Sequence, residues 1–333
     1  MDWNIFVFHW NYNNYIMKNI YSNIFNATNK SIHKVIKALN KNELVGVPTE
    51  TVYGLAGNAY SNSAVKKIYK LKGRPTRNPL IIHYPDLKML KNDIELNNNF
   101  FKLYRTFCPG PITFVLKKNK NSQLSKLATA NLRTVAVRFP KNKIIRKILK
   151  SLKFPLAIPS ANKSTRVSPV SAKDVAEEFK GSLKLILNGG NCKIGLESTV
   201  IDLTSTPKIL RPGFINPAQL SKKLGKTINV SKGTKSIKSP GMLKRHYSPG
   251  IPIKLNQKKA SKNEAFIVFG KKYKKSKNTF NLSVKSNLTE AAKNLYKTLR
   301  VIKNKNYKMI HVSPIPKTGL GLAINDRLKR AAK

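Results

Sequence analysis

The feature that most constrains the fold is a series of short apolar runs, each with polar residues at one end. The runs span 44–55, 70–83, 133–140, 155–162, 195–203 and 209–213. Each contains a stretch of Val, Ile and Leu with the length and composition of a buried strand. Thr, Ser, Asn, Lys or Arg stands where that strand would reach solvent. Polar groups that converge at strand ends over an α/β sheet commonly form a small-molecule site, so the pattern predicts an enzyme.

Segments of helical and strand periodicity alternate through the first two thirds of the chain. Apolar residues recur at helical spacing from Ile32 to Leu39, and Ser31 is placed to cap that helix. We expect further helices near 62–72, 98–107, 142–151, 171–180 and 216–224, and strands near 44–48, 79–83, 112–117, 134–139, 155–159, 184–187, 198–203 and 208–211. So many strands with short connections predict one large, twisted, mixed sheet flanked by helices.

A change in composition separates this region from the last part of the chain. Lys, Ser, Thr, Gly and Pro dominate residues 226–250, which predicts a linker between domains at 17–225 and 251–333. The last domain is expected to be a small α/β unit with strands near 265–270 and 308–312 and helices near 289–303 and 320–331. Gly319 and Gly321 lack the third glycine and the downstream acid of a dinucleotide fingerprint, so we interpret them as a tight turn.

Three features predict a cytoplasmic protein that does not enter a membrane. Residues 1–16 lack the basic start and the cleavage site of a signal peptide, and we expect a disordered or non-native extension before Met17. No apolar stretch approaches the roughly 20 residues of a membrane helix. Cys108 and Cys192 are too few for a disulfide framework and have no metal-ligand spacing, and Cys108 is expected to be a small apolar filler.

The net charge of +50 leaves two interpretations open. A polyanion such as tRNA is one possible partner. The alternative is a compositional drift toward Lys, Asn and Ile, the residues of A/T-rich codons. The even spread of Lys favours the drift, because nucleic-acid footprints usually cluster on one face. Weak non-specific RNA binding is compatible with both.

The densest cluster of polar groups is the segment KGRPTRNPL at 72–80. The sequence has no Gly-rich phosphate loop, kinase set, nucleophile elbow or His-rich metal motif, so dispersed side chains must hold any nucleotide. Lys72, Arg74, Arg77 and Asn78 stand in one stiff turn and suit a triphosphate. Taken alone, in a chain this rich in Lys, the segment would more often be a solvated basic loop.

Read together and in order, the motifs resemble one family. They are PTETVYGL, KGRPTRNPL, CPGPITFVL, PSANKS, GLESTV and LRPG, followed by SPGMLKRHYSPG at 239–250 and GLGLAINDRLKRAA at 319–332. This series is similar to the Sua5/YrdC family of threonylcarbamoyl-adenylate synthases, in its longer Sua5 form. The resemblance implies a YrdC-like fold with a small, Rossmann-like C-terminal α/β domain.

The resemblance also implies roles for individual residues. Lys72 and Arg74 match a pair that is tied to catalysis in the family, as do Ser160 and Asn162. The positions that hold L-threonine match Thr51, His83, Arg138, Ser160 and Ser198. The positions that contact ATP match Arg74, Asn78, Thr134, Asn162, Ser168, Arg211 and Tyr247. Without the resemblance, His83 at a strand end would be interpreted as a structural histidine.

The implied reaction joins L-threonine, bicarbonate and ATP into L-threonylcarbamoyl-AMP and releases pyrophosphate. Mg²⁺ is expected to accompany ATP, and Glu50 and Glu197 could bind a metal or simply balance charge. We further expect the linker to fold over the nucleotide as a lid that uses Tyr247, the alternative being a passive tether. The product would serve N6-threonylcarbamoylation of adenosine 37 of tRNA through a separate threonylcarbamoyl transferase.

Two alternatives compete with this interpretation. One is a non-catalytic, basic RNA-binding protein of the same fold. The other is a carbamoyl-transfer module, which is disfavoured because the chain has no Cys-x-x-Cys pair. The chain also departs from the family pattern at Thr165, where glycine is usual, at Asn188, where aspartate is usual, and at Leu243-Lys244. The geometry of the turn at Thr165 is the main structural question that these departures raise.

Overall fold

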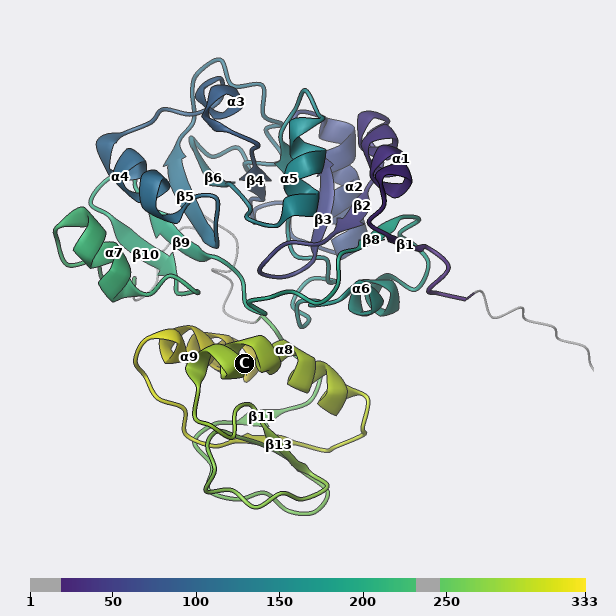
Figure 1. Ribbon diagram of the computed structural model, residues 1–333, viewed down its shortest axis with the longest axis vertical. Helices are drawn as coiled ribbons and strands as arrows, with labels where there is room; N and C mark the ends of the chain where they lie inside the picture. Colours follow the sequence, from purple (N-terminus) through teal and green to yellow (C-terminus); the bar gives the residue numbers. More distant parts are fainter. Residues whose placement is uncertain (1–18, 232–245) are drawn as a thin grey trace, which may run out of the picture.

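The computed structural model describes residues 19–231 and 246–333, which form two α/β domains, each with its own sheet (Figure 1). The expected extension at 1–16 and residues 232–245 of the expected linker lie outside the described residues. The domain boundaries given above stay predictions.

The larger domain contains ten strands and seven helices among the described residues. The strands are β1 (Ile24–Asn26), β2 (Val45–Val47), β3 (Gly54–Asn58), β4 (Ile81–His83), β5 (Ile112–Lys117), β6 (Thr134–Arg138), β7 (Leu156–Ala157), β8 (Ile186–Asn188), β9 (Thr199–Asp202) and β10 (Lys208–Arg211). The helices are α1 (Asn29–Asn40), α2 (Asn62–Lys72), α3 (Leu87–Lys91), α4 (Asn98–Phe107), α5 (Lys143–Lys150), α6 (Ala172–Phe179) and α7 (Pro217–Leu224).

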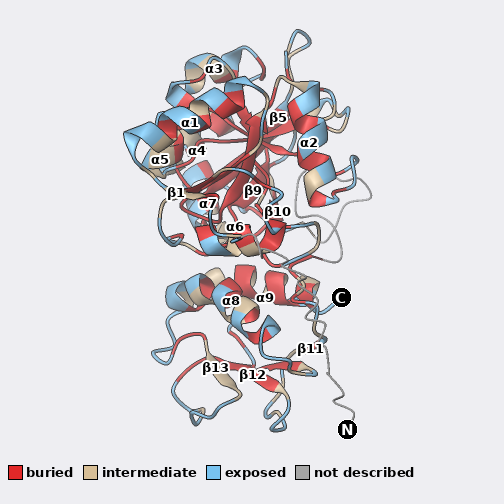
Figure 2. Ribbon diagram, turned by 90° about the vertical axis from the view of Figure 1, so that its right-hand side faces the viewer, coloured by how far each residue is buried: buried red, intermediate tan, exposed pale blue. Residues whose placement is uncertain are grey.

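These strands form one mixed sheet in the order β1-β8-β2-β3-β7-β4-β6-β5-β9-β10. β4 pairs with β6 in parallel, while β7 and β5 flank that pair in antiparallel orientation. The predicted large mixed sheet is therefore confirmed. Its central strands are buried (Figure 2), as expected for runs of Val, Ile and Leu.

Helices cover the sheet through separate apolar clusters. α1 and α5 pack through Val35, Leu39, Ile145 and Ile148 onto one set of strand residues, while α2, α4, α6 and α7 contribute to a second cluster.

The expected N-cap of α1, Ser31, was wrong by three residues. Thr28 is the N-cap and its side chain accepts a hydrogen bond from the backbone N–H of Ser31, because Ser31 already lies within the first turn.

The C-terminal domain has an all-parallel sheet in the order β11-β14-β12-β13. Its elements are β11 (Ile253–Lys254), β12 (Ala265–Val268), β13 (Thr279–Asn281), α8 (Leu288–Lys303), β14 (Ile310–Val312) and α9 (Leu320–Ala331). α8 and α9 form the layer that faces the larger domain (Figure 1). The tight turn at Gly319 and Gly321 is confirmed: Gly319 has φ +51°, and a Cβ on Gly321 would lie 1.9 Å from the carbonyl oxygen of Pro316.

None of the helices within 19–231 and 246–333 has the length and apolar character needed to span a membrane. Both cysteines are free thiols.

Candidate active site

A cavity lies where the carboxyl ends of β4 and β6 meet the loops after β7 and before β9. His83 and Arg138 end these two neighbouring strands and stand opposite one another in the register. The cavity is lined by Thr49, Val52, Tyr53, Gly54, Arg74, Ile81, His83, Arg138, Ile158, Pro159, Ser160, Glu197, Ser198, Arg211, His246 and Tyr247. Its free volume is about 40 Å³. Pockets for drug-sized ligands reach several hundred Å³, so the side chains here leave much less free space than a nucleotide and an amino acid need.

Arg138 supplies a buried cation at one end of the cavity. Its Nη2 donates to Glu50 Oε1 at 2.5 Å, and Glu50 Oε2 accepts from the backbone N–H groups of Lys141 and Asn142. Both side chains are almost fully buried. Arg138 Nε has no hydrogen-bond partner among the described residues. An oriented guanidinium with an available N–H suits the carboxylate of a small ligand.

Hydroxyl groups and a neutral histidine lie beside Arg138. Burial and the nearby Arg138 charge lower the pKa of His83 well below its usual value, so its imidazole is uncharged at neutral pH. Ser198 Oγ lies 2.7 Å from Thr113 Oγ1. Thr51 is buried behind the wall, where its Oγ1 lies 2.9 Å from that of Thr49. Thr49, rather than Thr51, lines the cavity.

Arg74 and Arg211 also line the cavity. Arg74 is held by Asn78: its Nε donates to the Asn78 carbonyl at 3.0 Å and its Nη2 to Asn78 Oδ1 at 2.6 Å. Burial, with the neighbouring Arg211, lowers the pKa of Arg74 to about 10, which still leaves it charged at neutral pH. Arg211 donates to the carbonyl and the hydroxyl oxygen of Ser198 at 3.0–3.1 Å. Arg77, from the same predicted cluster, is exposed.

Lys72 lies behind the cavity wall rather than on it. Its Nζ donates to the carbonyl of Ser160 at 2.6 Å and also to that of Asn162. Burial and the charge of Arg74 lower the pKa of Lys72 well below its usual value. The ammonium therefore fixes the backbone of the loop that follows β7. The Asn162 side chain donates within the same loop, to the carbonyls of Lys163 and Arg166.

Tyr247 and His246 close the cavity. The Tyr247 ring is fully buried, its hydroxyl has no hydrogen-bond partner among the described residues, and its backbone has φ +66°. A bulky residue in the left-handed region is strained, and such strain is concentrated at functional sites. Burial, together with nearby Arg74, Lys72 and Arg211, lowers the pKa of His246 to about 3 and keeps it neutral.

The predicted site residues divide by position into those on the cavity wall, those that hydrogen-bond to wall residues, and two, Asn162 and Thr134, that do neither. On the cavity wall are Arg74, His83, Arg138, Ser160, Ser198, Arg211 and Tyr247. In hydrogen-bond contact with wall residues are Thr51, Lys72, Asn78 and Ser168. Asn162 follows Ser160 in the same loop. Thr134 begins β6, whereas Arg138 ends it, roughly 13 Å further along at the usual strand rise.

The two carboxylates that could have held a metal are already engaged. Both oxygens of Glu50 are bonded as described above, and Glu197 Oε1 accepts from Ser168 Oγ at 2.6 Å. Glu197 Oε2 accepts from Tyr296 and from Arg327. Among residues 19–231 and 246–333, no cluster of three metal-ligating side chains occurs. These contacts support charge balance as a role of both carboxylates.

Two family models together match nearly the whole described chain. The Sua5_yciO_yrdC model, described as "Telomere recombination", matches residues 37–213. The Sua5_C model, described as "Threonylcarbamoyl-AMP synthase, C-terminal domain", matches residues 215–333. The chain belongs to the Sua5/YciO/YrdC family. The presence of the second model identifies it as a member of the long Sua5 type.

Relatives of this Sua5-type chain match it along most of their length. Threonylcarbamoyl-AMP synthase from Pyrococcus abyssi is 37% identical over 318 residues, which cover 88% of this chain and 92% of the relative. The Bacillus subtilis protein of the same name is 36% identical, with 88% and 90% covered. A crystal structure of P. abyssi Sua5 complexed with L-threonine superposes with a TM-score of 0.85 at 35% identity, and covers 93% of this chain and 97% of that chain.

Sequence reasoning missed three residues of this Sua5-type site. Thr49 lies in the PTETVYGL motif two residues before Thr51, so the motif indicated its neighbourhood. Tyr296 and Arg327 come from the C-terminal domain and meet the larger domain at Glu197. Arg327 lies in the motif GLGLAINDRLKRAA at 319–332, which indicated its neighbourhood, whereas nothing in the local sequence around α8 distinguishes Tyr296 from other helix residues.

Proposed function

We propose that this chain is an L-threonylcarbamoyladenylate synthase. It would join L-threonine, bicarbonate and ATP into threonylcarbamoyl-AMP and release pyrophosphate and water. The observation that carries the proposal is that three buried cations, Arg138, Arg74 and Arg211, line one cavity. An amino-acid carboxylate and the phosphates of a nucleotide therefore have separate cationic anchors, and the side chains that fill the cavity must move apart to admit them.

At the first end, Arg138 binds the carboxylate of threonine through the N–H groups that Glu50 leaves available. Neutral His83 and the Ser160 and Ser198 hydroxyls can exchange hydrogen bonds with the threonine hydroxyl and amine. Because His83 is uncharged, it does not compete with Arg138 for the carboxylate. The Thr51 hydroxyl supports this end through Thr49.

The threonine amine captures carbon dioxide or bicarbonate to give a carbamate. The carbamate oxygen then attacks the α-phosphorus of ATP, and the bond to pyrophosphate breaks. Carbamates hydrolyse readily, so the intermediate must be kept from water and in line with the phosphorus. The buried side chains of His246 and Tyr247 in the cavity wall support this requirement, because they can exclude water from the bound substrates. No covalent enzyme intermediate is needed.

At the second end, Arg74 and Arg211 stabilise the charge that grows on the phosphates. Lys72 contributes by fixing the loop that carries Ser160 and Asn162, while Asn78 orients Arg74. Ser168, Asn162, Thr134 and Tyr247 complete the proposed set of nucleotide contacts. Mg²⁺ enters with ATP as part of the substrate, since both nearby carboxylates are engaged by the protein.

We further propose that the product is passed in the cytoplasm to a threonylcarbamoyl transferase that modifies adenosine 37 of tRNA. Threonylcarbamoyl-AMP carries an activated acyl group and needs an acceptor amine. In this proposal tRNA is an indirect partner of the chain.

The test is pyrophosphate release from ATP by purified protein, with L-threonine or bicarbonate omitted in turn. We expect release only when both are present. Pyrophosphate release in the absence of L-threonine or of bicarbonate would contradict the proposed reaction. No release, together with tRNA affinity that falls steeply with salt, would support a non-catalytic RNA-binding protein instead.

A further inference from the structure

A buried ion pair joins the two domains at the wall of the cavity. Arg327, on α9 of the C-terminal domain, is fully buried, and its Nε donates to Glu197 Oε2 at 2.9 Å. Glu197 is the one carboxylate among the described residues that line the cavity. The C-terminal domain therefore neutralises a charge that the larger domain presents to its own site.

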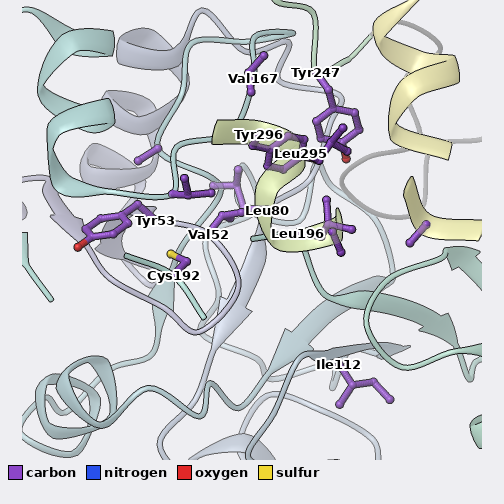
Figure 3. Packing of buried hydrophobic residues seen from close by; sticks show 14 of the residues in the cluster. Val52, Tyr53, Leu80, Ile112, Val167, Cys192, Leu196, Tyr247, Leu295 and Tyr296 are labelled. Carbon is purple, nitrogen blue, oxygen red and sulfur yellow. The ribbon is translucent and has the colours of Figure 1, made fainter. Parts of the chain in front are cut away.

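The contacts of Arg327 extend from this pair to both neighbouring parts of the site. Its Nη1 donates to the Pro212 carbonyl at 2.8 Å, directly after Arg211. Its guanidinium carbon lies 5.3 Å from the centre of the Tyr247 ring. Tyr247 in turn stacks on Tyr296 of α8, with ring centres 5.7 Å apart, and the two rings lie side by side in Figure 3.

Electrostatics indicates what the pair does. Burial alone would raise the pKa of Glu197, but Arg327 and Arg211, with hydrogen bonds from Ser168 and Tyr296, lower it to about 2. Glu197 is therefore ionised at neutral pH. An ionised, unpaired carboxylate on this wall would repel phosphate groups. It would also attract Arg211, whose charged form Glu197 already stabilises.

We propose that Arg327 is a positioning residue for the nucleotide end of the site, which masks Glu197 so that Arg211 stays available to the phosphates. The inference rests on the proposed function for the identity of the ligand. It assigns the C-terminal domain a direct part in the site: one of its side chains sets the charge of the cavity wall.

The alternative is that Arg327 is only a brace between domains. A brace works through its hydrogen bonds and packing, so neutralising Glu197 would not compensate for its loss. Masking makes the opposite prediction. Once Glu197 is neutral, the described part of the cavity wall carries no carboxylate for Arg327 to mask, and Asp326, which also accepts from Arg327 Nη1 at 2.8 Å, keeps Arg330 as a partner.

The experiment compares Arg327→Met, Glu197→Gln and the double variant in pyrophosphate release, with ATP and L-threonine varied separately. We expect Arg327→Met to raise KM for ATP roughly tenfold or more, with KM for threonine little changed. The double variant should recover most of kcat/KM for ATP, and Arg327→Lys should recover part of it. Lys329→Met, an exposed position on the same helix, is the matched control.

A double variant no better than Arg327→Met, or equal losses for both substrates, would overturn the inference in favour of a brace. If Arg327→Met does not fold, the double variant decides alone: ATP kinetics near wild type support masking, and a large loss contradicts it. If the wild-type protein releases no pyrophosphate, the proposed function fails, and calorimetric titration of the same variants with ATP tests the inference separately. Loss of ATP affinity that the double variant restores would support it, whereas wild-type protein that binds no ATP would overturn it.

Discussion

The two ends of the cavity each contain a buried Arg–Glu pair, but the pairs are built differently. Arg138 and Glu50 both belong to the larger domain, and Glu50 is further fixed by backbone N–H groups at the start of α5. Glu197 belongs to the larger domain and Arg327 to the smaller. Under the proposed function, the amino-acid end of the site is built within one domain, while the nucleotide end also uses the second domain and Tyr247.

This difference agrees with how the domains meet. Gly195, in the loop before β9, has φ +78°, and a Cβ there would lie 2.7 Å from backbone atoms of Lys293 on α8. Arg300 of α8 donates to the carbonyls of Val167 and Ser168. The contacts between domains therefore lie on the loops that carry Glu197 and Ser168 and, through ion pairs of Arg300 with Asp174 and Glu178, on α6, and not on the strands that carry His83 and Arg138.

The largest expected effect is at the amino-acid end. Replacing Arg138 with Met removes the carboxylate anchor and leaves Glu50 buried without its partner. We expect kcat/KM for threonine to fall about 1,000-fold, the order expected for loss of a buried charged contact, while ATP binding is retained. Initial rates at varied threonine concentration measure kcat/KM for threonine, and calorimetric titration with ATP measures ATP binding. An unchanged KM for threonine would place the amino acid elsewhere.

The second effect concerns the pH dependence of the stability that the Arg327–Glu197 ion pair provides. The folded-state pKa of Glu197, about 2, lies below its ordinary value of 4.5, which corresponds to about 3 kcal/mol of stabilisation above pH 4.5. That stabilisation is lost as pH falls from about 4.5 toward about 2. The difference in melting temperature between wild type and Glu197→Gln should therefore shrink between about pH 5 and about pH 2. A constant difference would show that ionised Glu197 contributes no stability.

The third effect is at Tyr247, whose ring closes the cavity. Tyr247→Ala opens the enclosure and removes the partner of Tyr296, so adenylate formation should slow roughly tenfold or more in kcat/KM for ATP. Tyr247→Phe is the matched control, because it keeps the ring and removes only the hydroxyl. Kinetics of Tyr247→Ala equal to those of wild type would rule out the predicted lid.

The smallest effect answers the question raised by Thr165. Its φ of +67° lies in the left-handed region, where a β-branched residue is strained and glycine is not. The Thr165 carbonyl accepts from the Ser248 backbone N–H at 2.8 Å, so this turn holds the residue after Tyr247. Thr165→Gly should raise the free energy of unfolding by about 0.5–1 kcal/mol, measured by denaturant titration. A decrease would mean that the threonine side chain outweighs the strain.

Much of the fold follows from apolar periodicity. The bounds of α2, α4 and α9 agree with the expected ranges, because each has a regular apolar face and a clear cap or turn. β3, with the sequence GLAGN, was missed because it contains no β-branched or aromatic residue. β1, α3, β11 and β13 were missed because they are too short to show a period.

The sequence predicted many of the residues that form the site, but not the directions in which their side chains point. The family resemblance indicated His83, Arg138, Ser198 and Arg211, and each stands at the end or the start of a buried strand. The motifs could not show that Lys72 faces the backbone of the loop after β7, since the direction of a side chain depends on tertiary packing. Nor could they show that Arg327, 130 residues from Glu197, neutralises it.

The most direct test of the contrast between the two ends is calorimetric titration with L-threonine of two variants, Arg138→Met and Arg327→Met. The account predicts that threonine binding is lost in the first and unchanged in the second, because the amino-acid end lies within the larger domain. Arg138→Lys and thermal unfolding check that the first variant is folded. Threonine binding that survives in Arg138→Met, or that is lost in Arg327→Met, would contradict the account.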